Sequence, residues 1–398
     1  MTTNFGVVAN VSNKMIDENG NIYNSIRQLA RVLGIKKDKI STSLKIYGYF
    51  QHKGVTYTLL SGEGRQPRIG DPESNENEAP VKIITIEKER EDEKEYQEFK
   101  NSKNVQELPF QIYKFSPVTK KKGYRYAVAL FSDAHIEEVV KPEAVNYLNE
   151  YNVKIAEERI TNYFRNLANC LENDNVNELI FASLGDTISG YIHEELAQTN
   201  EMSPLEATFK AQSLIYSGLK YLCEHPGLKG MKIRFIGIVG NHSRTTKKIQ
   251  HSNGFKMSYE WLMYQNIKKQ CELTGMDIEF YIPESELAIV KSSDDRTFIF
   301  AHGFQVKSGG NGTVCGIYPA LNRLCLKYSN VFHQDMLFIG HFHSTVNTPS
   351  AVVNGSIIGY NAFALTNGFL AERPSQQMIV YDTELGGQLL TRQIYCDK

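Results

Sequence analysis

The stretch Tyr126-Ala-Val-Ala-Leu-Phe-Ser-Asp-Ala-His135 joins an apolar run to two side chains that can bind a metal, Asp133 and His135. A continuous apolar run of this length is typical of a strand that is buried on both faces, as in a parallel sheet. Open α/β sheets place their ligands in the crevice outside the carboxyl ends of such strands. The stretch therefore predicts a buried strand whose end carries a functional site.

The same arrangement occurs four more times along the chain. The apolar runs 178–184, 232–239, 297–301 and 335–339 lead into Gly185-Asp186, Gly240-Asn241-His242, His302-Gly303 and Gly340-His341-Phe342-His343. Glycine lets the backbone turn sharply at a strand end, so that the next side chain faces the crevice. Five of the ten histidines of the chain lie in these five motifs. Together the motifs predict one metal site at the ends of five strands.

The order Asp-x-His, Gly-Asp, Gly-Asn-His, His, Gly-His-x-His resembles the calcineurin-like metallophosphoesterases, a superfamily that includes the Mre11-type nucleases. The likeness spans about residues 125–385. The stretch that starts at Ser189, the Asn241-to-Arg244 motif and Gly316-Ile-Tyr-Pro-Ala320 are similar to a phage-encoded branch described as DNA exonuclease-like. The resemblance implies an α/β fold, a four-layer αββα sandwich of two mixed sheets flanked by helices.

The resemblance also implies two divalent metal ions. It assigns Asp133, His135 and His343 to one ion and Asn241, His302 and His341 to the other, with Asp186 bridging both. Mixed imidazole and oxygen ligands suit Mn, Fe, Zn or Ni better than Ca, and we expect Mn²⁺. Alternate side chains of an extended segment share a face, which allows the two histidines of Gly-His-x-His to reach neighbouring ions.

The expected reaction is hydrolysis of a phosphodiester by a hydroxide that bridges the metals. The resemblance makes His242 the expected general acid, or at least a cationic contact to the phosphate. Two departures from the family pattern concern its support: Ser189 and Ser243 stand where the family commonly has carboxylates. His242 is then oriented by a carbonyl, by Glu194 or Glu195, or by another group.

Two further residues are candidates for substrate contact. Arg244, with Lys247 and Lys248 behind it, is either a phosphate clamp or part of a solvated basic loop. His193 either touches the substrate or caps a helix. The sequence leaves both alternatives open.

Residues 1–60 predict a separate small module. They carry eight Lys/Arg and three Asp/Glu, a net charge of +5, and apolar residues at helical spacing from Ile26 to Leu33. A second helix fits 37–47 and a strand fits 53–59. The pattern resembles the helix-turn-helix repeat of homing endonucleases. Residues Lys37, Lys39, Ser41, Thr42 and Lys45 on the second helix suit DNA contacts. A generic two-helix packing unit or a protein-binding arm is the alternative.

The remaining organisation follows from composition. Residues 61–80 are rich in Gly, Pro and acids and predict a flexible linker. We expect residues 81–124 to form a connecting strand and a charged helix, and the resemblance implies a metallophosphoesterase domain over 125–398. Residues 61–110 carry eight basic and thirteen acidic residues, so the net positive charge of residues 1–60 does not continue into this segment.

Composition excludes several classes of protein. The net charge of −1 and 11% aromatic residues are unlike a disordered chain, and no apolar run is long enough to span a membrane. Residues 1–10 lack the pattern of a secretory signal. Six cysteines without C-x-x-C spacing are typical of free thiols in a reducing cytoplasm, that of the host cell if the protein is phage-encoded. The Mre11 likeness implies a homodimer.

Three functions fit these observations. The first is a metal-dependent DNA nuclease that the N-terminal module directs to its substrate. The second is a phosphatase or phosphodiesterase that acts on a protein or a nucleotide. The third is a catalytically inactive DNA-binding protein. The complete ligand set favours an enzyme, and the basic module favours DNA as its partner.

Overall fold

The chain divides into two compact units, Met1–Glu107 and Leu108–Lys398, and each is described by itself. The computed structural model describes residues 15–17, 22–23, 26–33, 40, 43–44, 49–52, 55–59, 111–119, 122–306, 317–366 and 370–397. The predicted linker at 61–80, and the strand and charged helix expected between 81 and 100, lie outside these residues.

The first unit contains a helix and a four-stranded antiparallel sheet of order β2-β1-β4-β3. Its elements are β1 (Met15–Asp17), β2 (Ile22–Tyr23), α1 (Ile26–Leu33), β3 (Tyr49–His52) and β4 (Val55–Leu59). Leu29 of α1 packs with Met15, Phe50 and Tyr57 in a small apolar core. The predicted first helix and terminal strand are confirmed, but most of the sheet was not predicted, because strands of two to four residues show no periodicity.

The helix-turn-helix stays a prediction. Of the predicted second helix, the structure describes only residues 40 and 43–44, which are helical. The five residues proposed to contact DNA, Lys37, Lys39, Ser41, Thr42 and Lys45, lie outside the described residues.

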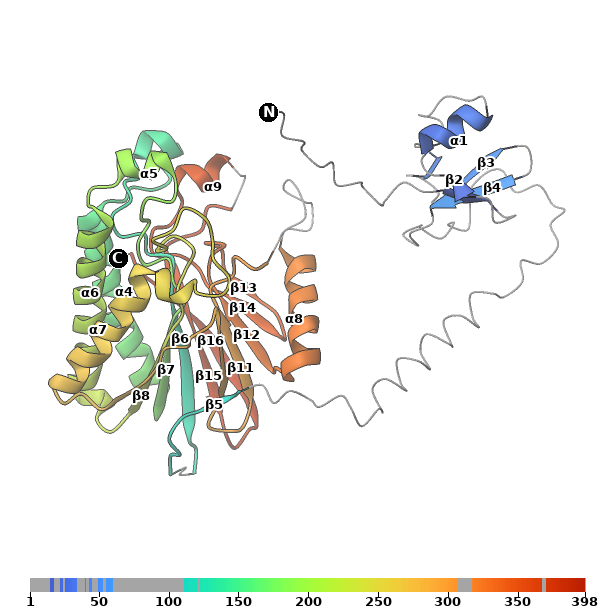
Figure 1. The fold of residues 1–398 in the computed structure, drawn as a ribbon. Helices are drawn as coiled ribbons and strands as arrows, with labels where there is room; N and C mark the ends of the chain where they lie inside the picture. The colour runs from blue at the N-terminus through green and yellow to red at the C-terminus, as the bar shows by residue number, and fades with distance from the viewer. Residues whose placement is uncertain are drawn as a thin grey trace. The chain divides into compact units, whose positions relative to one another are not determined.

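The second unit is built on two six-stranded sheets (Figure 1). The first has the order β16-β15-β6-β7-β8-β9 and the second β13-β14-β12-β11-β10-β5. The first consists of β6 (Arg125–Phe131), β7 (Glu178–Ser183), β8 (Lys232–Gly237), β9 (Ile278–Tyr281), β15 (Ser375–Asp382) and β16 (Gly387–Tyr395). The second consists of β5 (Tyr113–Lys114), β10 (Leu287–Lys291), β11 (Thr297–Ala301), β12 (Met336–Ile339), β13 (Val346–Asn347) and β14 (Ala351–Val353). Strands β6 to β9 run parallel, as do β11, β12 and β14. Both sheets are mixed, because β15 pairs with β6 and β10 pairs with β11 in antiparallel orientation.

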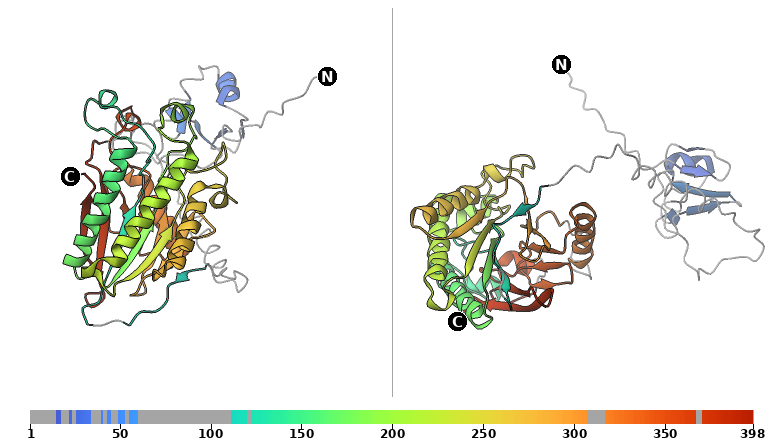
Figure 2. Two further views of the ribbon diagram at one scale, coloured as in Figure 1. Left: turned by 90° about the vertical axis from the view of Figure 1, so that its left-hand side faces the viewer. Right: turned by 90° about the horizontal axis from the view of Figure 1, so that it is seen from below.

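Helices cover the outer face of each sheet, which gives the four-layer αββα sandwich (Figures 1 and 2). The first sheet is covered by α4 (Val153–Asn173), α6 (Pro204–Glu224) and α7 (Tyr259–Leu273), and the second by α8 (Tyr318–Phe332). The short helices are α5 (Glu194–Thr199), α9 (Ala362–Thr366), η2 (Pro142–Val145), η3 (Pro226–Leu228) and η4 (Phe255–Met257). The predicted fold class is confirmed.

Strand β6 shows why the sandwich forms from this sequence. Successive side chains of a strand point to opposite faces. Ala127, Ala129 and Phe131 pack toward α4, α6 and α7, whereas Tyr126 and its alternate neighbours pack between the two sheets. Because the strand is apolar at every position from Tyr126 to Phe131, both of its faces can be buried over this stretch.

Two expectations about composition concern the described residues alone. No helix among them combines the length and apolar character that crossing a membrane requires. The five cysteines that the structure describes, Cys170, Cys223, Cys271, Cys325 and Cys396, are free thiols.

Candidate metal centre

The five predicted motifs meet at one edge of the sandwich. Asp133 follows β6, Asp186 follows β7, and His302 comes directly after β11. Hydrogen bonds between backbone groups tie the motifs together: Asp133 N donates to Gly185 O at 3.0 Å and Gly340 N to His302 O at 2.7 Å. The parallel strands of the two sheets thereby bring side chains from distant parts of the chain to one place.

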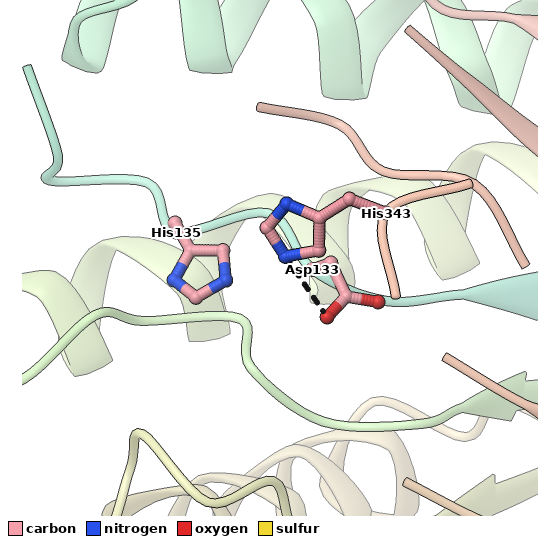
Figure 3. A group of neighbouring side chains, drawn as sticks. All are labelled: Asp133, His135 and His343. Carbon is pink, nitrogen blue, oxygen red and sulfur yellow. Dashed lines mark ion pairs between the residues drawn. The ribbon is translucent and has the colours of Figure 1, made fainter. Parts of the chain in front are cut away.

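Asp133, His135 and His343 form the first group of ligand-type side chains (Figure 3). One nitrogen or oxygen atom of each lies within 4.8 Å of the others. His343 Nε2 is 3.4 Å from Asp133 Oδ1, and the His135 and His343 rings are 5.2 Å apart between centroids. This is the set of residues that the resemblance assigns to one metal.

Asp186, His302 and His341 form the second group, with the same 4.8 Å limit between their ligand atoms. His302 Nε2 is 2.8 Å from Asp186 Oδ2. The His341 backbone N–H donates to both carboxylate oxygens of Asp133, at 3.1 and 3.0 Å, so the two groups adjoin. The predicted bridging residue Asp186 and two of the three ligands predicted for the other ion thus lie together.

The backbone at the centre is held in an uncommon conformation. Five predicted ligands have positive φ: Asp133 (53°), His135 (45°), Asp186 (51°), His341 (72°) and His343 (53°). Residues with a Cβ rarely adopt the left-handed region. Where they do, the surrounding structure holds them in it, and such residues are concentrated at active sites and ligand-binding sites. The conformations aim these side chains into a common space rather than along their strands.

Charge shifts the pKa values of the buried groups. Burial opposes ionisation of Asp186, but the imidazoles of His302 and His242 outweigh it and hold the pKa of Asp186 well below its usual range. Burial disfavours charged His302, yet Asp186 more than offsets this and raises the pKa of His302 to about 9. Burial and His302 lower the pKa of His341 to about 4. The Asp186 carboxylate is thus held ionised, as a metal ligand must be.

The residues present fit divalent metal ions. His135 Nε2 and Asn241 Oδ1 are buried and have no hydrogen-bond partner among the described residues. Buried polar atoms are nearly always paired, so each such atom needs an explanation. Both belong to predicted ligands, and an ion coordinated at this place would satisfy them. The mixture of imidazole and oxygen donors suits Mn, Fe, Zn or Ni.

We expect the free energy of unfolding of the protein freed of divalent cations by a chelator to fall as the pH rises from about 6.5 to about 9. The pKa of His302 is about 9 in the folded chain, above its unfolded value. Its stabilisation is therefore complete below the unfolded pKa and is lost as the pH rises through the folded one. His341, whose pKa is lowered, is neutral in both states across this window.

Saturating Mn²⁺ is expected to reverse that slope, because imidazoles bind metals in their neutral form. Thermal denaturation at several pH values, in EDTA and in Mn²⁺, measures both slopes. A midpoint that Mn²⁺ leaves unchanged at every pH would contradict the metal centre.

The structure shows what orients His242. Its Nδ1 lies 3.0 Å from the backbone oxygen of Ser189. A carbonyl only accepts, so Nδ1–H donates and Nε2 is left for other partners. Of the alternatives that the sequence left open, the orienting group is a carbonyl. The His242 backbone N–H also donates to Asp186 Oδ1 at 2.8 Å, which ties the predicted acid to the predicted bridge.

Arg244 and His193 both lie close to this motif. The Arg244 guanidinium donates to the backbone oxygens of Asn241 and Thr246, so it braces the loop that carries a predicted ligand. His193 occupies the N-cap position of α5 but makes no capping hydrogen bond with its side chain. Its ring instead lies 6.0 Å from that of His242, centroid to centroid. The substrate roles of both residues stay predictions.

Sequence reasoning missed two buried carboxylates. Glu260, in the first turn of α7, accepts from Thr187 N (2.6 Å), Gly240 N (2.7 Å) and Ser243 Oγ (2.8 Å). It thus joins the motif of Asp186, the predicted bridging residue, to that of His242. Its carboxylate contacts Ser243, the position at which the family pattern commonly has an acid. Glu137 accepts from two backbone N–H groups of the Ser189 loop. Burial raises the pKa of Glu137 to about 7.

The hydroxyl of Ser189 has a separate role. It lies 3.0 Å from His135 Nδ1 and donates to Glu138 Oε2 at 3.1 Å. Groups that hold the second nitrogen of a metal-binding histidine fix its orientation and tautomer. Ser189 thus supports a predicted ligand through its side chain and His242 through its backbone.

The chain is similar to several solved structures. No protein-family model matches the chain, and neither does any curated protein. Vps29 bound to Zn²⁺ from Entamoeba histolytica is similar at 12% identity and a TM-score of 0.27, over 68% of this chain and 99% of that one. A 5'-nucleotidase from Candida albicans is similar at 9% identity and a TM-score of 0.32, over 70% and 52% of the chains. A predicted phosphoesterase from Streptococcus pneumoniae is similar at 12% identity and a TM-score of 0.25, over 65% and 84%. Identities and scores at this level assign no substrate.

Proposed function

We propose that the second unit is a phosphodiesterase that depends on two divalent metal ions, and that its substrate is DNA. One observation carries the proposal: two groups of ligand-type side chains, with Asp133 in one and Asp186 in the other, adjoin at the strand ends of an αββα sandwich. A carboxylate between two such groups can hold two cations in one site.

Bound cations would neutralise the anionic phosphate and lower the pKa of a water molecule toward about 7. The chain's own residues supply the rest. Asp133, His135 and His343 would hold one ion, and Asn241, His302 and His341 the other, with Asp186 between them. Because a water molecule activated by the metals would be the nucleophile, the reaction requires no serine or cysteine nucleophile.

His242 is the proposed general acid. Its Nδ1–H is held by the Ser189 carbonyl, so Nε2 is the atom that gives a proton to the leaving oxygen. Its ring lies 4.8 Å from that of His135, centroid to centroid, and therefore borders the first group. His193, the next ring outward, is a candidate for contact with the substrate.

The choice of DNA rests on the first unit. Residues 1–60 carry a net charge of +5, and their pattern resembles a DNA-binding repeat. A tethered binding module raises the local concentration of a catalytic unit on its substrate. The same charge gives no advantage on a small nucleotide, which favours DNA over the alternative substrates.

Replacement of His242 by alanine is expected to lower DNA cleavage by ~10²–10⁴-fold, the usual contribution of a general acid. The assay is cleavage of end-labelled single- and double-stranded DNA, in Mn²⁺ or in EDTA. The fragment pattern distinguishes endonucleolytic from exonucleolytic action. His225→Ala, at the C-terminal end of α6, is the control and should cleave like the wild type.

Failure to cleave either form of DNA in Mn²⁺ would contradict the proposed substrate. Hydrolysis of a small phosphodiester by the same sample would then indicate a phosphodiesterase for another substrate. Loss of both activities would indicate a catalytically inactive DNA-binding protein.

A further inference from the structure

A single peptide group links His242 to a buried carboxylate. The oxygen of the Ser189–Gly190 peptide accepts the hydrogen bond from His242 Nδ1, at 3.0 Å. The N–H of the same peptide donates to Glu137 Oε1, at 2.8 Å. The imidazole, the peptide and the carboxylate thus form one chain of hydrogen bonds. Neighbouring hydrogen bonds polarise and strengthen one another in such a chain.

Glu137 is placed to fix that peptide. Its side chain is fully buried, and the same oxygen also accepts from Ser189 N, at 2.9 Å. Two consecutive N–H groups therefore point at one carboxylate oxygen. Rotating the Ser189–Gly190 peptide would take the Gly190 N–H away from Glu137 Oε1 and leave this donor without a partner in a buried place, a cost of about 1–3 kcal/mol.

The surrounding loop also restricts the position of the Ser189–Gly190 peptide. Gly190 has a φ of +59°, and a Cβ added to it would lie 2.6 Å from His242 O. Asn200 Nδ2 donates to Gly190 O at 3.1 Å and holds the far side of the residue. The loop is therefore packed directly against the backbone of the His242 motif.

We infer that Glu137 is a positioning residue for the general acid, acting on His242 through the Ser189–Gly190 peptide. This inference rests on the proposed function. The resemblance leads one to expect a carboxylate at position 189, where the chain has serine. Glu137, which follows β6, supplies a carboxylate that reaches His242 through one intervening peptide group. No contact between Glu137 and the substrate is needed.

The test compares two substrates that differ in their need for an acid. 4-Nitrophenolate leaves bis(4-nitrophenyl) phosphate without a proton, whereas the alkoxide of a thymidine dinucleotide must be protonated. Glu137→Leu is expected to lower the rate on the dinucleotide by ~10²-fold, the lower end of a general acid's contribution, and the rate on the nitrophenyl ester by less than about threefold. Glu137→Gln keeps an acceptor oxygen and should retain most of the dinucleotide rate.

Two further variants make the test specific. His242→Ala should show the same selective loss, and the Glu137→Leu/His242→Ala double variant should lose no more than His242→Ala alone, because the two residues act as one unit. Glu178→Gln changes a buried carboxylate that is paired with Arg234 in the core. It should lower the denaturation midpoint but leave the ratio of the two rates unchanged.

Different failures have different meanings. Equal loss on both substrates in Glu137→Leu, or additive losses in the double variant, would overturn the positioning role while the phosphodiesterase stands. A His242→Ala variant without substrate selectivity would overturn the acid role and this inference with it. A wild type that hydrolyses neither substrate would overturn the proposed function itself.

Discussion

Asp186→Asn is expected to lower phosphodiester hydrolysis by ~10³-fold or more and to reduce the number of Mn²⁺ ions bound per chain. Asparagine keeps the shape of the side chain but removes the charge that would hold two cations, and a metal's contribution to catalysis is worth several kcal/mol, at 1.36 kcal/mol per tenfold. Asp186 is buried, and its Oδ2 lies 2.8 Å from His302 Nε2, so the substitution also removes the negative charge from the ion pair with His302.

The matched control is Asp295→Asn. Asp295 also has a positive φ, 65°, but lies in the turn between β10 and β11. Asparagine tolerates this conformation as aspartate does, so the control should keep full activity. Rates on bis(4-nitrophenyl) phosphate and metal analysis after dialysis measure both variants. An Asp186→Asn variant with undiminished activity would contradict the bridging role.

Gly240→Ala is expected to inactivate the protein through sterics alone. A Cβ at this position would lie 2.1 Å from Asp186 Oδ1 and 2.3 Å from Asp186 N, so Asp186, the proposed bridging residue, must move. A displacement of about 1 Å can cost ~10²-fold in rate, and overpacking of this kind destabilises by about 1–3 kcal/mol. We therefore expect loss of activity together with a lower denaturation midpoint.

Gly387→Ala separates this effect from the general cost of replacing a glycine. The nearest atom to a Cβ at Gly387 is Arg296 Nη2, at 4.0 Å, and neither glycine has a positive φ. Activity assays and thermal denaturation of the two variants side by side make the comparison. Similar results for both would show that the close approach of Gly240 to Asp186 is not what the site requires.

The fold and most of the candidate site could be predicted because both follow from local patterns. The run from Tyr126 to Phe131 is apolar at every position, and such a strand is stable only with both faces covered. Each predicted ligand comes shortly after a strand that is buried along almost its whole length. Since the parallel strands end at one edge of the sandwich, their ligands meet there whatever their separation in sequence.

The supporting residues could not be predicted in the same way. Glu260 binds Thr187 N across 73 positions of the chain, and Glu137 binds Gly190 N across 53. In a sequence, a glutamate that becomes buried cannot be distinguished from one on the surface, because the hydrogen-bond partners that identify it lie far away along the chain. The role of Ser189 was hidden for a related reason: it supports His242 through its backbone, which every residue type has.

The first unit shows a second limit. The helix Ile26–Leu33 was readable from its apolar spacing, whereas β1 and β2 are only three and two residues long. Strands so short are held by pairing and by packing on Leu29 and Tyr57 rather than by their own pattern.

The central claim is a site for two metal ions that hydrolyses phosphodiesters, and titration of the chelated protein with Mn²⁺ tests it most directly. Bound Mn²⁺ is measured by electron paramagnetic resonance while the hydrolysis of bis(4-nitrophenyl) phosphate is followed in the same samples. The account predicts two Mn²⁺ ions per chain, a signal from a coupled pair, and activity that rises as the second ion binds. A protein that binds no Mn²⁺, or one that binds two ions and hydrolyses no phosphodiester, would contradict it.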